Sequence, residues 1–142
     1  MIVSAGLLAA AKLPPGSGDG SPAAARGVVE RYYAAIERRD FRAAWLAWDR
    51  DGAASGKSLA FFARGFSRTA RSRVTAGTPY DGEGAAGSTF LTVPVRVEAV
   101  TKDGRRQRFI GTYVLRRVND VPGATRTQLN WHLASASLRQ VR

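Results

Sequence analysis

The chain has 142 residues and carries 22 Lys and Arg against 11 Asp and Glu, which gives a formal net charge of +11. It contains no cysteine and one histidine, so disulfides and thiolate metal sites are excluded and a zinc or iron site is disfavoured. The length predicts one domain, and the basic balance favours anionic partners. Because the arginines are scattered along the sequence, we interpret most of this charge as a solubilising surface.

The first 21 residues read as an apolar segment followed by a flexible linker. Residues 2–11 are apolar but too few to span a bilayer as a helix, so no transmembrane helix is expected. They resemble the hydrophobic part of a secretory signal, with small residues near Ala9 and Ala11 that suit cleavage. We therefore expect export to the periplasm or cell envelope, and a cytoplasmic location if this segment is not a signal. Residues 22–142 then form the single folded domain.

Helical periodicity dominates the first half of that domain. Ser21 and Pro22 suit a helix start, with a capping hydroxyl followed by proline at the first helical position. Asp40 is predicted to cap a second helix that extends to about Arg50, and Ser58 a short third one. The apolar residues that share a face in these helices are Val28, Val29, Tyr32, Tyr33, Ile36, Phe41, Ala44, Trp45, Trp48, Leu59, Phe62 and Phe66.

Alternating strands dominate the second half. A short strand is predicted at residues 71–78, and long ones at 89–100, 107–118 and 128–138. Asp103 and Gly104 mark a hairpin between the first two long strands, and residues 119–125 mark a turn before the last. The positions expected to face inward are Leu91, Val93, Val95, Val97, Ala99, Phe109, Gly111, Tyr113, Leu115, Leu129, Trp131 and Leu133.

The order of helices followed by a curled antiparallel sheet resembles the nuclear transport factor 2-like superfamily, which includes SnoaL-like cyclases and ketosteroid isomerases. The resemblance is carried by VVERYYAAIERRDFRAAW at residues 28–45 and by the strand sequences TFLTVPVRVEAV, RFIGTYVLRRV and LNWHLASASL. Small exported bacterial proteins of this fold look similar in GAASGKSLAFFARGF. The resemblance implies an α+β domain in which helices pack on a curved, cone-shaped antiparallel sheet that encloses a cavity.

Enzymes of this superfamily place a titratable group inside the cone. None of the predicted inward strand positions is a carboxylate or an imidazole, and His132 falls on the outward face. Tyr113 is the inward strand residue with a hydroxyl, which suits an oxyanion donor or an ordinary core residue. The sequence therefore indicates no catalytic residue, metal site or cofactor, and leaves open whether the protein is an enzyme.

We expect a non-catalytic module that binds a small apolar ligand or a protein partner of the cell envelope. The candidate cavity lining is Tyr33, Trp48, Phe62, Tyr113 and Trp131. A lyase or isomerase type of enzyme is the alternative, and anion or nucleic-acid binding through surface arginines is a second one, weakened by the lack of aromatic–basic interleaving. On the outer sheet face, Phe90, Ile110 and Val114 are compatible with a homodimer.

Overall fold

The computed structural model describes residues 19–81, 87–119 and 122–142, so the predicted signal-like segment at residues 2–11 lies outside the described residues. Its helices are α2 (Pro22–Glu37), α3 (Phe41–Leu46), the 3-10 turn η1 (Ala53–Ser55) and α4 (Leu59–Arg64). Its strands are β1 (Thr69–Ala76), β2 (Tyr80–Asp81), β3 (Ser88–Thr101), β4 (Arg106–Val118) and β5 (His132–Val141). Among the described residues, no helix is long and apolar enough to cross a membrane.

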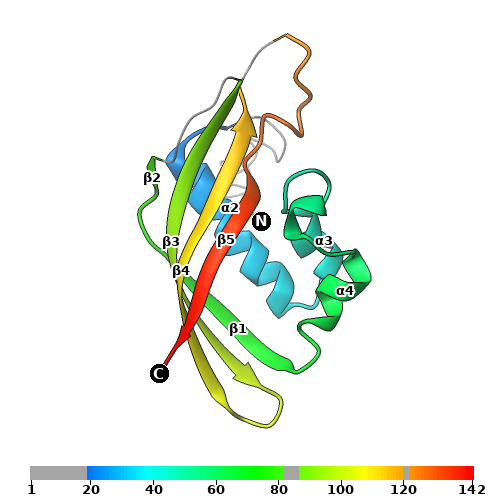
Figure 1. Ribbon diagram of the computed structural model, residues 1–142, viewed down its shortest axis with the longest axis vertical. Coiled ribbons are helices and arrows are strands. Elements are labelled where there is room, and N and C mark those ends of the chain that lie inside the picture. Colours follow the sequence, from blue (N-terminus) through cyan, green and yellow to red (C-terminus); the bar gives the residue numbers. More distant parts are fainter. Residues whose placement is uncertain (1–18, 82–86, 120–121) are drawn as a thin grey trace, which may run out of the picture.

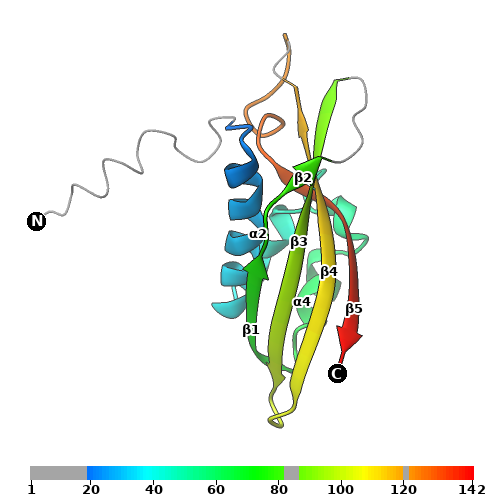
Figure 2. The ribbon, with the colours of Figure 1, turned by 90° about the vertical axis from the view of Figure 1, so that its left-hand side faces the viewer.

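The strands form an antiparallel sheet in the order β1-β3-β4-β5, with β2 paired to β3. Helix α2 runs along one face of the sheet, and α3 and α4 stand beside it on that same side (Figure 1). Figure 2 shows the other face, over which none of the described helices passes. The fold class predicted from the sequence is confirmed: few helices pack on a curved antiparallel sheet in an α+β domain.

The helix starts follow the capping residues that the sequence predicts. Ser21 Oγ accepts a hydrogen bond from the Ala24 amide at 3.1 Å, and Pro22 opens α2. Asp40 Oδ1 accepts from the Ala43 amide at 3.1 Å. These side chains satisfy amides that would otherwise lack an intrahelical partner, which fixes where α2 and α3 begin.

The second helix is shorter than predicted, because it ends at Leu46 rather than near Arg50. Beyond that end the backbone pairs with β5: the Leu133 amide donates to the Ala47 carbonyl and the Asp49 amide donates to the Leu133 carbonyl, each at 2.8 Å. Trp48 therefore lies after the helix, in a bridge to Leu133, and not on the helical face that it was predicted to share with Trp45. A tertiary backbone contact overrides the helical spacing here.

The inner face of β3 is buried as the alternation predicts, with Leu91, Val93, Val95, Val97 and Ala99 all at most 7% exposed. Strand β5 begins later than predicted, at His132 rather than residue 128. The Leu129 amide donates to the Thr125 and Arg126 carbonyls, so residues 125–130 form a turn instead of extending the strand. A bulge opposite Val114 and Leu115 then shifts the pairing of β4 with β5.

Candidate functional site

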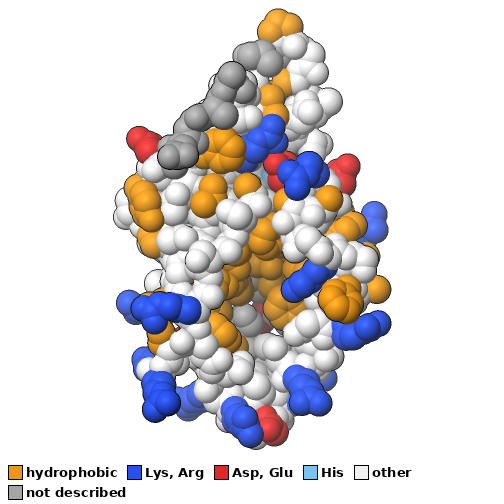
Figure 3. All heavy atoms as spheres, viewed as in Figure 1, with side chains coloured by type: hydrophobic (Ala, Val, Ile, Leu, Met, Phe, Trp, Pro, Cys, Tyr) orange, Lys and Arg blue, Asp and Glu red, His pale blue; other side chains and the backbone are white. Residues whose placement is uncertain are grey.

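A cavity of about 380 Å³ lies on the inner side of the sheet, between the strands and the helices. Figure 3 shows a hollow with hydrophobic side chains in its depth, on the face where β5 and the α3–α4 pair stand on either side. The apolar part of its lining consists of Tyr32, Tyr33, Trp48, Phe62, Phe66, Val97, Ala99, Phe109, Tyr113 and Leu138. The volume suits a small organic molecule.

The structure brings together Tyr33, Trp48, Phe62 and Tyr113 from the predicted lining. Trp131 is buried at 3% exposure, but it does not line this cavity. Its indole Nε1 donates to the Ser21 carbonyl at 3.2 Å, and the Arg117 guanidinium lies 6.0 Å from its ring centroid. Trp131 lies just before β5 and packs against the start of α2, away from the cavity. The sequence predicted that its side chain points inward, but not which end of the sheet it occupies.

Edge-to-face contacts, and one tilted contact between Tyr32 and Phe62, join the aromatic rings at the cavity wall. The Tyr32 ring lies 5.1 Å from that of Tyr33 and 5.9 Å from that of Tyr113, centroid to centroid. Trp48 lies 6.2 Å from both Tyr32 and Tyr113, and the Phe62 ring is 6.3 Å from that of Tyr32. Such contacts hold the rings in fixed orientations, so they form a wall in place before any ligand binds.

Three tyrosine hydroxyls supply the polar groups of this wall. The Tyr33 and Tyr113 hydroxyl oxygens are 2.6 Å apart, and Trp48 Nε1 donates to the Tyr32 hydroxyl at 3.3 Å. Burial raises the pKa of Tyr33 to about 12. Burial also raises the pKa of Tyr32 and of Tyr113, because an ionised phenol would lose its hydration. All three hydroxyls are therefore protonated at neutral pH and cannot serve as bases there. In the Tyr33–Tyr113 pair one hydroxyl donates to the other, so the pair has one proton left to donate.

Sequence reasoning missed polar residues that line the cavity, including Lys57 and Ser72. Ser72 is 6% exposed and lies on the same side of β1 as Val74 and Ala76, so strand alternation would have found it. Lys57 belongs to the loop before α4, where Trp45 Nε1 donates to its carbonyl at 2.9 Å. No periodic signal marks a loop residue, and its place beside the cavity depends on how Trp45 holds the loop.

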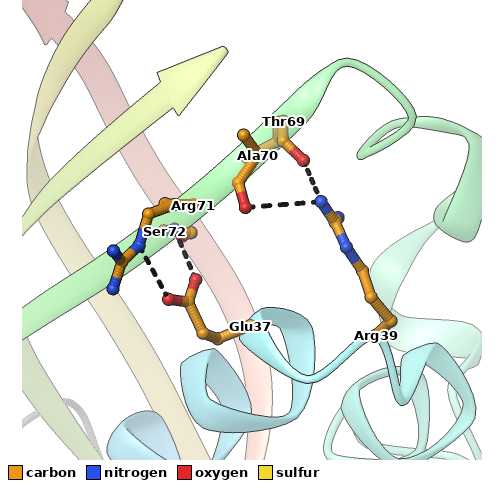
Figure 4. A network of polar contacts seen from close by, with 6 residues as sticks. All are labelled: Glu37, Arg39, Thr69, Ala70, Arg71 and Ser72. Carbon is orange, nitrogen blue, oxygen red and sulfur yellow. Dashed lines mark hydrogen bonds and ion pairs between the residues drawn. The ribbon is translucent and has the colours of Figure 1, made fainter. Parts of the chain in front are cut away.

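Contacts between the end of α2 and β1 position one wall of the cavity (Figure 4). Glu37 Oε1 accepts from the Ser72 amide at 2.7 Å, and its Oε2 lies 3.4 Å from Arg71 Nε. The Arg39 guanidinium donates to the carbonyls of Thr69 and Ala70, where the pairing of β1 with β3 is irregular. These bonds tie the first residues of β1 to the helix end, and so fix Ser72 at the cavity.

The side chains that line the cavity, within the described residues, include neither a carboxylate nor an imidazole. His132 lies outside it, opposite Arg116 on the outward side of the sheet, with its Nδ1 3.1 Å from the Asn130 carbonyl. In the same described ranges, no cluster of three His, Asp or Glu side chains could hold a metal ion. The arrangement can therefore bind an apolar body and donate hydrogen bonds to it.

No protein-family model and no curated protein matches the sequence. Among solved structures, the chain is similar to a candidate aromatic ring hydroxylase from Novosphingobium aromaticivorans, with a TM-score of 0.57 and 14% identity. The alignment covers 85% of this chain and 96% of that chain. At this identity the likeness shows the fold alone. That fold has few helices packed on an antiparallel sheet in an α+β domain, as the sequence predicts.

Proposed function

We propose that this protein, as a member of the nuclear transport factor 2-like superfamily, binds a small, mainly apolar molecule in the aromatic cavity without converting it. The observation that carries the proposal is a cavity of about 380 Å³ whose wall is a packed aromatic cluster that includes Tyr32, Tyr33 and Tyr113. An apolar ring would gain from leaving water, since apolar burial contributes about 25 cal/mol per Å².

The polar groups restrict which molecules fit. One hydroxyl of the Tyr33–Tyr113 pair donates to the other, and the remaining proton of the pair favours a ligand with a carbonyl, ether or phenol oxygen that accepts a hydrogen bond. Lys57 is exposed and contributes to the lining, so an acidic or strongly polar group on the ligand would be favoured beside it. The preferred ligand is therefore an aromatic or alicyclic molecule with an acceptor at one end and an anionic group at the other.

A fluorescence titration with anilinonaphthalene sulfonate tests the proposal, because this probe combines aromatic rings with an anionic group. Ala99 lines the cavity and is 7% exposed, so Ala99→Phe would fill part of it. Ala34 is exposed on α2 and does not line the cavity, so Ala34→Phe is the matched control. We expect Ala99→Phe to weaken binding at least tenfold and Ala34→Phe to leave it unchanged. Equal effects of the two variants would refute binding in the cavity.

One observation favours an enzyme of the lyase or isomerase type as a second candidate. The Tyr33–Tyr113 hydroxyl pair, at 2.6 Å in a buried setting, could stabilise an oxyanion as a preorganised donor. The name of the structural neighbour, a candidate aromatic ring hydroxylase, also fits an enzyme better than a binding module. Loss of the Tyr113 hydroxyl would then lower turnover by about 100-fold. Recovery of chemically unchanged ligand after long incubation with the protein would favour the binding module instead.

We also propose that two copies pair through the outer sheet face and that the domain is exported. Phe90, Ile110 and Val114 are half-buried on that face, which supports pairing through its apolar part. Ile110→Asp would then halve the mass measured by light scattering, and an unchanged mass would contradict the dimer. The apolar run at residues 2–11 supports export. N-terminal sequencing of the mature protein tests this, since an intact Met1 on cytosolic protein would contradict it.

A further inference from the structure

Arginines that are scattered along the sequence gather on the outer face of the sheet, near the β3–β4 hairpin. Figure 2 shows this face, and Figure 3 shows Lys and Arg side chains around the same end of the molecule. A hollow of about 810 Å³ lies there, and its lining includes Arg71, Arg73, Arg106, Arg108 and Glu98. We call these four arginines the arginine patch. None of these four arginines lines the aromatic cavity on the inner face, although Ala99 and Gln107 contribute to the lining of both hollows.

The strand register places the four side chains in two rows. In the strand register, Glu98 of β3 lies directly between Arg73 of β1 and Arg108 of β4. In the next row Val100 stands between Arg71 and Arg106. Adjacent strands are about 4.8 Å apart and alternate residues on one strand about 6.7 Å apart, so the patch covers about 10 Å by 7 Å. This is the scale of neighbouring phosphates on a polynucleotide.

Little negative charge offsets the patch. Glu98 is the one acidic residue among the described residues that line this hollow. Arg71 lies 3.4 Å from Glu37, and Arg108 donates to the Arg142 carbonyl. Neither Arg73 nor Arg106 has an ion pair with any described residue. Clustered guanidinium groups repel one another, so an anion that enters the hollow gains from several of them together.

The shape and chemistry of the patch select one kind of anion. Guanidinium groups bind phosphate through paired hydrogen bonds. The patch lines a hollow, and the apolar residues of that hollow are Ala99, Val100 and Val141 rather than the bulky side chains that enter a bilayer. Among the described residues, none that lines it is an aromatic side chain on which a nucleic-acid base could stack. These features favour the backbone of a nucleic-acid duplex over a membrane surface or an unpaired strand.

We propose that the arginine patch binds the phosphodiester backbone of a nucleic-acid duplex, without preference for base sequence. Each arginine neutralises backbone charge and releases counterions, so binding weakens steeply with salt. Glu98 lies between Arg73 and Arg108 and opposes this binding. The site acts independently of the aromatic cavity, and its failure would leave the proposed ligand binding untouched.

Fluorescence anisotropy of a labelled DNA duplex tests the proposal with the full chain. Arg73→Gln, Arg106→Gln and Arg108→Gln are combined in the patch variant, and all three side chains are exposed, so the fold should persist. The control variant has the same net charge and combines Arg31→Gln, Arg42→Gln and Arg64→Gln on the exposed sides of the helices. We expect the patch variant to bind roughly 100-fold more weakly and to lower the slope of log affinity against log salt by about 3. The control variant should change the affinity for the duplex by less than about threefold.

Glu98→Gln provides a gain-of-function test that does not depend on the folding of a weakened variant. Removing this carboxylate should raise duplex affinity about fivefold, because it lies between two arginines of the patch. Duplexes of different base composition should bind alike. The proposal is overturned if the patch and control variants lose equal affinity, since overall charge would then explain binding. It is also overturned if Glu98→Gln changes nothing, or if heparin, polyphosphate or phosphatidylglycerol vesicles bind more tightly than the duplex.

Discussion

Removing one hydroxyl from the Tyr33–Tyr113 pair is expected to cost more stability than removing both. The two oxygens are 2.6 Å apart, and the residues are 6% and 3% exposed. Tyr113→Phe keeps the ring contacts with Tyr32 and Trp48 but leaves the Tyr33 hydroxyl without its partner. An orphaned buried hydroxyl costs about 1–3 kcal/mol, so each single variant should lower the free energy of unfolding by about 2 kcal/mol.

The double variant Tyr33→Phe with Tyr113→Phe removes both hydroxyls and leaves neither orphaned. Its cost should be about 1–2 kcal/mol, well below the sum of the single costs, because the two residues form one interaction. Urea unfolding followed by tryptophan fluorescence measures all the variants. Tyr80→Phe is the control, since Tyr80 is 54% exposed, and should change stability by less than about 0.5 kcal/mol. Strictly additive costs would refute the reasoning and show that water in the cavity satisfies each hydroxyl separately.

Three further predictions test the fold: a pair of glycine substitutions, the dependence of stability on pH, and the loss of a helix cap. Gly27→Ala should stabilise α2 by about 0.5–1 kcal/mol because glycine is a poor helix former, whereas Gly111→Ala should cost more than about 3 kcal/mol in chemical unfolding. The reason is that a Cβ at Gly111 of β4 would lie 1.9 Å from the Ser137 carbonyl oxygen of β5. Equal effects of the two alanine substitutions on stability would contradict this close approach of β4 and β5. The raised pKa of Tyr33, from 10.0 to about 12, contributes stability that is complete below pH 10 and is lost as the pH rises to 12. This contribution is on the order of 3 kcal/mol. Because burial raises the pKa of Tyr32 and Tyr113 too, unfolding free energies across that range should fall less steeply in Tyr33→Phe than in the wild type, but should still fall. Ser21→Ala should cost about 1 kcal/mol in thermal unfolding, and no change would show that the α2 cap is not formed.

Local chemistry in the sequence predicted much of the fold. Ser21 and Asp40 cap helices as expected, and the alternation in β3 correctly gave its buried face. These features depend on neighbouring residues, so one segment is enough to read them. The end of α3 could not be read this way, because Leu133 stops the helix through backbone bonds from a distant strand.

For the candidate site, the sequence predicted which face of the sheet the side chains point to, but not where along the sheet each of them lies. Alternation shows which way Trp131 points, yet it does not show which end of the sheet the residue occupies, and Trp131 packs at the start of α2. Lys57 lies in a loop, where no periodicity applies. The arginine patch was hidden for a similar reason: Arg73 and Arg108 are far apart in sequence and meet only through the pairing of each strand with β3.

The nuclear Overhauser contacts of bound anilinonaphthalene sulfonate test the central claim of an aromatic ligand cavity most directly. The account predicts contacts from the probe rings to the ring protons of Tyr113 and Phe62, which line the cavity on the inner face. Ala99→Phe should remove those contacts. Contacts to Phe90 or Ile110 on the outer sheet face, with none to Tyr113, would contradict the account.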